Sequence, residues 1–346
     1  MSSCDDMPHQ ERPLHRTPAA DDPRGHFVLE RNAPSRAPPP HTARHGPARP
    51  GGTVGGVPSP PATPAPRCLG VDLAWGEGTA RRPPAETGLV VLDADGSVLD
   101  AGWARGLDDV HAWITRWAVP GSVVAVDAPL LLPNATGMRP GEREVGRGYG
   151  RWHVSANASN AGMLWQAGRR LRERLERDGL AYDDGLAPHA PGTTTVFECY
   201  PYTTLVGVEE LGYDERRPRY KRPDPSLPLA DRRAARAAAC DDLLLRLGRL
   251  ATAVPPLDLT THPETRALLD EPSPLVDRAY KHREDLLDAA VAAWTAALRL
   301  RTPHRLQVLG ATSDPVQEAH GRRATIRAPA RPAQRTSGAP SPTPLP

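Results

Sequence analysis

Apolar and polar residues alternate along the first patterned stretch of the chain, residues 68–75. Leu69, Val71 and Leu73 fall on one face, so this stretch predicts a strand whose other face carries Asp72. Short apolar runs bounded by glycine, proline or aspartate predict further strands. These runs are residues 87–93, 98–103, 122–127 and 195–200.

Helical spacing of apolar residues begins after the third predicted strand. Val110, Ile114 and Trp117 predict a helix over residues 107–118, which ends before a proline and a glycine. The stretch 129–161 is rich in glycine and is predicted to be a loop. Later helices are predicted over residues 161–177, 229–250, 262–270 and 283–300.

The order of these elements predicts the fold class. Asp95-Gly96 favours a hairpin between the second and third strands, and the apolar run 122–127 is typical of a buried parallel strand. Three hairpin-connected strands are followed by a helix, a strand, further helices, a strand and a terminal helix. This order indicates an α/β domain with a mixed sheet, antiparallel at one edge and parallel in the centre, flanked by helices.

Proline content limits the predicted domain to residues 67–310. Of the 41 prolines, 15 lie in residues 1–66 and 7 in residues 311–346. The first segment has few residues that can build a core, and the second mixes arginine with proline, alanine and serine. Both are predicted to be disordered tails, because so little apolar burial cannot offset the entropy of ordering a chain.

Charge and cysteine content narrow the class of protein. The 43 basic and 41 acidic residues give a net charge of +2, so contacts with a polyanion must come from local patches. The four cysteines form no Cys-x-x-Cys pair, and no secretory segment or membrane-length apolar run is evident. These features predict a cytoplasmic protein without disulfides and without a membrane partner.

Acidic residues interrupt several of the apolar segments. Asp72 lies within the first strand, Asp127 ends the fourth and Glu198 lies within the fifth. Asp285 and Asp288 are three residues apart in the last predicted helix and therefore share a face. A buried carboxylate without a partner is costly, so each of these acids is expected to be paired, hydrogen-bonded or bound to a metal.

Each acid also has an ordinary structural explanation. Asp72 can pair with an arginine, Asp127 can cap a helix or a turn, and Glu198 can pair with Arg217 or a similar residue. Together, however, the acids favour a site for Mg²⁺ or Mn²⁺, which prefer hard oxygen ligands. Two such ions can activate a water and stabilise the leaving oxygen of a phosphodiester. No spacing of histidine and cysteine indicates zinc.

Four short motifs resemble those of a bacterial and archaeal family. They are Gly70–Trp75, Val124–Pro129, Phe197–Pro201 and Glu284–Ala290. In this order they are similar to the domain-of-unknown-function 429 family, whose members are described as predicted ribonuclease-H-like nucleases. The resemblance covers about residues 67–310. It implies a ribonuclease-H-like fold and a metal-dependent nuclease that hydrolyses nucleic acid.

The resemblance also implies roles for the acids. In ribonuclease-H-like nucleases the first-strand acid is the central metal ligand, which corresponds to Asp72. Asp285 and Asp288 are similar to the two aspartates that the last helix offers in Holliday-junction resolvases. Asp127 and Glu198, the latter in a Glu-x-Tyr-Pro motif, compete for the second acidic position of the fold. The implied metal ligands are Asp72, Asp127, Asp285 and Asp288, and Glu198 is a further candidate catalytic residue.

Arginines recur every four residues in the glycine-rich stretch after the fourth strand. They are Arg139, Arg143, Arg147 and Arg151. Because the glycines disfavour a helix, these arginines are predicted to project from a loop and bind phosphates of nucleic acid. Trp152 is predicted to stack on a base, and His153 to form hydrogen bonds or act as a general base. The alternative is an ordinary surface loop with solvated arginines.

Three functions are compatible with these patterns. The first is a nuclease dependent on Mg²⁺ or Mn²⁺ that acts on RNA or DNA. The second is a noncatalytic ribonuclease-H-like module that binds nucleic acid or a protein and retains the acids as relics. The third is an actin-like kinase-type phosphotransferase, which shares the opening strands and the early aspartate. That fold requires a duplicated second half, for which residues 67–310 leave no room.

Overall fold

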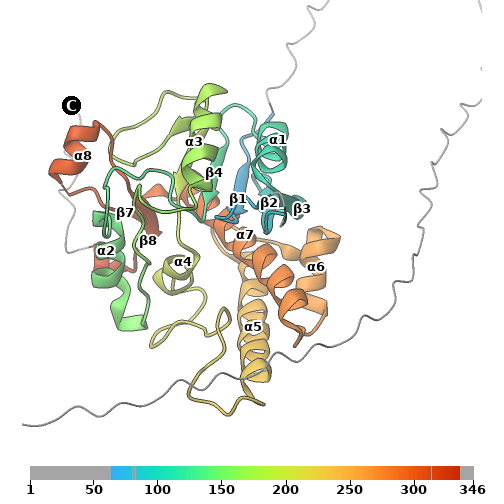
Figure 1. Cartoon of the computed structure of the whole chain (residues 1–346). Helices are drawn as coiled ribbons and strands as arrows, with labels where there is room; N and C mark the ends of the chain where they lie inside the picture. The colour runs from blue at the N-terminus through green and yellow to red at the C-terminus, as the bar shows by residue number, and fades with distance from the viewer. Residues whose placement is uncertain (1–63, 80, 82, 313, 336–346) are drawn as a thin grey trace, which may run out of the picture. The chain divides into compact units, whose positions relative to one another are not determined.

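The computed structural model describes residues 64–79, 81, 83–312 and 314–335 (Figure 1). All of them belong to one of two units into which the chain divides, residues 61–346. Six strands form a sheet in the order β3-β2-β1-β4-β6-β5. They are β1 (Cys68–Asp72), β2 (Glu86–Leu92), β3 (Val98–Arg105), β4 (Val123–Val126), β5 (Ala181–Tyr182) and β6 (Thr195–Glu198).

The predicted mixed sheet is confirmed. β1 pairs with β2, and β2 with β3, in antiparallel fashion. β4 runs parallel to both β1 and β6, and β5 runs parallel to β6. The carboxyl ends of β1, β4 and β6 therefore meet at the same edge of the sheet, where the loops that follow them are free to form a site.

Helices cover both faces of this sheet (Figure 1). They are α1 (Leu107–Trp117), α2 (Pro140–Tyr149), α3 (Ala167–Arg177), α4 (Pro201–Gly207), α5 (Arg232–Gly248), α6 (Pro263–Asp270), α7 (Asp277–Arg301), α8 (Pro315–His320) and α9 (Pro332–Arg335). α1 and α3 pack on one face and α7 packs on the other. The helices predicted from periodicity are confirmed, although α3 begins at residue 167 and α7 at residue 277.

Glycines in the central strands allow α7 to pack unusually close to the sheet. A Cβ at Gly70 would lie 2.1 Å from the carbonyl oxygen of Ala289, and one at Gly88 would lie 2.0 Å from that of Asp285. No larger residue fits at either strand position without moving the helix. This close packing brings the acidic part of α7 next to the end of β1.

The glycine-rich stretch after β4 contains a helix, so the prediction of a loop there is wrong. α2 begins at Pro140 and buries Val145 and Tyr149. At its amino end the Glu142 carboxylate accepts hydrogen bonds from the backbone N–H and the Nε–H of Arg139. Glycine costs about 1 kcal/mol relative to alanine in a helix, and burial of this face outweighs that cost.

The prediction of a disordered tail over residues 311–346 is also wrong for the described part of that segment. β7 (Leu306–Leu309) pairs with β8 (Ile326–Pro329), and every residue of β8 is buried. The Tyr149 hydroxyl donates a hydrogen bond to the carbonyl oxygen of Pro329. The domain therefore extends to residue 335. Apart from residues 64–66, the predicted amino-terminal tail lies outside the described residues.

In the described part of the chain, no helix has the length and apolar character needed to cross a membrane. Cys68, Cys199 and Cys240 are buried free thiols. Burial raises the pKa of the Cys68 thiol to about 12, so it has little nucleophilic character at neutral pH.

Candidate functional site

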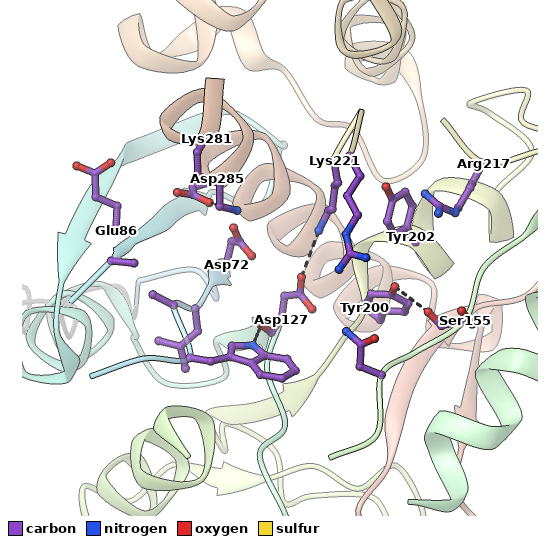
Figure 2. A pocket seen from close by; sticks show the side chains of 16 residues that line it. Asp72, Glu86, Asp127, Ser155, Tyr200, Tyr202, Arg217, Lys221, Lys281 and Asp285 are labelled. Atoms are coloured by element: carbon purple, nitrogen blue, oxygen red, sulfur yellow. Dashed lines mark hydrogen bonds and ion pairs between the residues drawn. The ribbon is translucent and has the colours of Figure 1, made fainter. Parts of the chain in front are cut away.

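A cavity of about 450 Å³ opens at the edge of the sheet where β1 and β4 end (Figure 2). Its acidic residues are Asp72, Glu86, Asp127 and Asp285, and its cationic residues are Arg217, Lys221, Arg222 and Lys281. Its other lining residues are Leu73, Ala74, Trp75, Ala85, Ser155, Asn157, Tyr200 and Tyr202. Opposite charges thus face one another across a space large enough for a small ligand.

Asp72 and Asp127 lie side by side at the carboxyl ends of neighbouring parallel strands. Val71 pairs with Val126, and the backbone N–H of Asp127 donates to the carbonyl oxygen of Val71 at 2.8 Å. Alternation along each strand places both acids on the face of the sheet that α7 covers. Burial, and then the negative charge of neighbouring acids, raise the pKa of both carboxyl groups, although Lys221 opposes this rise. The structure thus places both of these predicted site residues in one cavity.

Asp285 reaches the same cavity from α7. Its carboxyl group lies close to that of Asp72 (Figure 2). Burial, followed by the charge of Asp72, raises the pKa of Asp285 to about 8. At neutral pH this raised pKa favours the protonated form of Asp285.

Asp288 lies behind the cavity wall rather than in it. Its side chain is 0% exposed, and its carboxylate accepts a hydrogen bond of 2.6 Å from the Tyr220 hydroxyl. Its other oxygen lies 2.7 Å from the Lys221 ammonium. The sequence predicts that Asp285 and Asp288 both bind the metal. In the structure Asp285 lines the cavity, whereas Asp288 forms an ion pair with Lys221.

Lys221 is a site residue that the sequence analysis does not identify. Its ammonium lies 2.7 Å from Asp288 and 3.8 Å from Asp127, and it points into the cavity (Figure 2). Burial alone would lower the pKa of Lys221, but the carboxylates of Asp288 and Asp127 raise it well above its usual value. Lys221 therefore carries a full positive charge between two acids.

Lys281 lies one helical turn before Asp285. Its ammonium is 2.6 Å from the Asp285 carboxylate and 3.1 Å from that of Glu284. The whole chain contains two lysines, Lys221 and Lys281, and both line this cavity. That composition is the signal in the sequence that could have identified them.

Glu198 does not reach the cavity that holds the other acids. It pairs in register with Val126, so it projects from the face of the sheet opposite α7. Its carboxylate accepts hydrogen bonds of 2.8 and 2.6 Å from Arg139 and one of 3.0 Å from the Leu130 N–H. The expected convergence of Glu198 with the aspartates is therefore corrected: Glu198 forms a buried ion pair, and its partner is Arg139 rather than Arg217.

The residues predicted to bind substrate after β4 also lie outside this cavity. Arg139 is buried between Glu198 and Glu142, which leaves it no contact with a ligand in solvent. Trp152 is 1% exposed and lies beneath Arg151, so it cannot stack on a base. Arg143, Arg147 and His153 are exposed but do not line the cavity. These predictions are corrected because the stretch is a packed helix, not a loop beside Asp127.

The cationic wall comes instead from the segment between α4 and α5. Arg217 stacks over the Tyr202 ring at 4.3 Å and donates to the carbonyl oxygen of His153 at 2.8 Å. Tyr200 donates from its hydroxyl to the carbonyl oxygen of Ser155 at 3.1 Å (Figure 2). These contacts fix an aromatic and cationic wall opposite the acids.

The acids suit a hard cation in chemistry, although they are not arranged as a closed ligand set. Among the described residues, no three His, Cys, Asp or Glu side chains have the spacing of a metal site. Asp72, Asp127 and Asp285 nevertheless offer only carboxylate oxygens, and Mg²⁺ usually binds one or two carboxylates and keeps several waters. The ammonium groups of Lys221 and Lys281 supply positive charge beside these acids.

A family described as protein of unknown function (DUF429) matches residues 70–307. The chain belongs to the DUF429 family. The matched region of this DUF429 protein contains every acid of the cavity and both lysines, whereas β8 lies beyond it. Comparisons with curated proteins and with solved structures found no match.

Proposed function

We propose that this protein is a nuclease that hydrolyses phosphodiester bonds of RNA or DNA and depends on Mg²⁺ or Mn²⁺. One observation carries the proposal: Asp72, Asp127 and Asp285 face Arg217 and Arg222 across a single cavity. Within the described residues, neither arginine forms an ion pair with a carboxylate. Both are therefore available to an anionic ligand.

A phosphodiester suits this division of charge. Guanidinium groups bind phosphate oxygens through paired N–H donors, so Arg217 and Arg222 would hold the substrate. Asp72 and Asp285 would hold the cation, which when bound lowers the pKa of a water and stabilises the leaving oxygen. Hydrolysis forms a bond from the water oxygen to phosphorus and breaks the bond from phosphorus to a sugar oxygen, which takes up a proton.

The aromatic side chains of the cavity support nucleic acid as the source of that phosphate. Trp75, Tyr200 and Tyr202 line the same space, and the rings of Tyr200 and Tyr202 pack edge to face with centroids 6.0 Å apart. Stacking of a base on an aromatic side chain contributes about 1–3 kcal/mol. We place the activity in the cytoplasm, as expected from the scattered cysteines.

Incubation with labelled substrates tests this function. Single-stranded RNA, single-stranded DNA, an RNA–DNA hybrid and a four-way junction are incubated with the full chain and Mg²⁺ or Mn²⁺. We expect cleavage that stops on chelation and is lost in Asp72→Asn. Asp178→Asn is the matched control, because Asp178 is exposed and pairs with His111 far from the cavity.

A lack of cleavage of all four substrates with either metal would refute the nuclease proposal. If the protein then bound the same substrates in a salt-sensitive manner, the noncatalytic binding module would take its place. Circular dichroism of each variant establishes that the fold is intact, so that loss of cleavage reports on the site.

A further inference from the structure

The use of lysine in this chain is restricted to one place. Two of the 43 basic residues are lysines, and both contact acids of the same cavity. Arginine serves at every other cationic position, including the ion pairs of the core. A guanidinium is a broad planar fork, whereas an ammonium is a compact point charge. Beside its acids the cavity therefore carries compact point charges, whereas Arg217 and Arg222 belong to the opposite wall.

Lys221 is held in place by buried residues behind the cavity wall. Asp288 is fully buried and binds both the Tyr220 hydroxyl and the Lys221 ammonium. The backbone carbonyl of Tyr220 accepts a hydrogen bond from the buried Tyr280 hydroxyl, which ties this segment to α7. The Lys221 side chain is only 21% exposed. Its ammonium is thus fixed at the position where a cation would bridge Asp127 and Asp288.

Lys281 is placed differently. Its side chain is 58% exposed and contacts acids of its own helix, Glu284 and Asp285. The ammonium reaches solvent, whereas the carboxylates that it contacts are buried, with side chains 7% and 4% exposed. Asp72 has no ion pair within 4 Å among the described residues, and it lines the cavity with Asp285. A cation that binds at Asp72 and Asp285 has only the solvent-facing Lys281 ammonium to replace.

The acids thus offer two positions for a cation. One lies at Asp72 and Asp285, and the other lies between Asp127 and Asp288. We propose that the Lys221 ammonium permanently takes the second position, between Asp127 and Asp288, so that the site binds a single divalent ion at Asp72 and Asp285. This inference rests on the proposed metal-dependent function. Lys221 then contacts the substrate phosphate directly, on the side of the cavity away from the ion.

Counting bound ions tests the inference without relying on activity. Metal-free full-length protein is titrated with Mn²⁺ by calorimetry, and electron paramagnetic resonance distinguishes isolated ions from a coupled pair. We expect the wild type to bind one ion, with the spectrum of an isolated Mn²⁺. Lys221→Met leaves Asp127 and Asp288 without their ammonium, and we expect it to bind a second ion. Adding Asp127→Asn to that variant should return the number to one.

Arg217→Met is the matched control, because it removes one cavity charge that contacts no acid; it should keep one ion. Two ions in the wild type, or one ion in a folded Lys221→Met protein, would overturn the inference while leaving a metal-dependent nuclease standing. A wild type that binds no Mn²⁺ would refute both the inference and the metal dependence of the proposed function. If Lys221→Met does not fold, the count and spectrum of the wild type decide the question.

Discussion

Asp72 at the end of β1 and Asp285 on α7 bring their carboxyl groups together in one cavity, where burial and then the charge of Asp72 raise the pKa of Asp285 to about 8. The contact exists because Gly88, which pairs with Asp72 in the sheet, has no side chain to hold α7 away. Two acids this close cannot both ionise at low cost, so one of them retains a proton until a cation replaces it. Both the stability and the chemistry of the protein should therefore depend on this pair.

We expect the metal-free protein to lose stability as the pH rises from about 5 to about 8. Burial and Asp72 raise the folded-state pKa of Asp285 to about 8, whereas its ordinary value is 3.8. The folded protein keeps this proton over an interval in which the unfolded chain has released it, so a rise in pH favours unfolding. Glu284, with a pKa raised to about 7, acts in the same direction.

Thermal melts in chelator across this pH range measure the effect. Asp285→Asn carries no titrating group at this position and should flatten the fall in melting temperature, leaving the part that Glu284, Asp72 and Asp127 contribute. A variant with the same pH slope as the wild type would show that Asp285 titrates normally.

Gly88→Ala should destabilise the protein and separate α7 from β1. The added Cβ would lie 2.0 Å from the backbone oxygen of Asp285, and backbone on both sides leaves no flexible side chain to yield. Overpacking of this kind costs about 1–3 kcal/mol or more, and urea unfolding measures it. Gly102→Ala is the matched control in the same sheet, because no atom lies within 4 Å of its Cβ position. Equal stability of the two variants would contradict the close packing of α7.

Much of this site follows from the alternation of residues along the strands. Asp72 and Asp127 end neighbouring parallel strands, and the parity that places Val71 and Val126 on one face places both acids on the other. The same rule separates Glu198 from them, since Phe197 and Cys199 have the parity that faces α7. An acid within an apolar strand indicates a buried carboxylate with a partner. Only the strand register shows which face of the sheet each acid lies on and which residue is its partner.

Local sequence patterns do not predict the other parts of the structure around the site. The segment that carries Tyr220 and Lys221 has no periodicity, and its position is set by contacts with Asp288 and Tyr280 on α7. The helix α2 is similar, because the burial of Val145 and Tyr149 outweighs the low helix propensity of its glycines. Tertiary contacts decide both cases, and a single sequence does not display such contacts.

Arg139→Met should destabilise the protein strongly without altering metal binding. The substitution leaves the buried carboxylates of Glu198 and Glu142 without their partner, and breaking such a buried pair costs about 3–5 kcal/mol. Adding Glu198→Gln removes one of the two uncompensated charges and should recover part of that loss. Chemical denaturation of the two single variants and the double variant measures the coupling. Unchanged Mn²⁺ binding in Glu198→Gln would agree with its position outside the cavity, and loss of the ion there would restore Glu198 as a ligand.

Arg222→Ala should weaken the binding of RNA and DNA of any sequence to a similar degree. Removal of one phosphate contact also lowers the slope of log affinity against log salt by about 1. Fluorescence anisotropy measures both effects in an Asp72→Asn background, where cleavage does not interfere. Arg147→Ala is the matched control, since it removes the same charge from the exposed surface of α2, away from the cavity. If Arg147→Ala and Arg222→Ala had equal effects, nucleic acid would be held by the general basic surface. An effect of Arg222→Ala alone assigns phosphate binding to the cavity wall that faces Asp72 and Asp127.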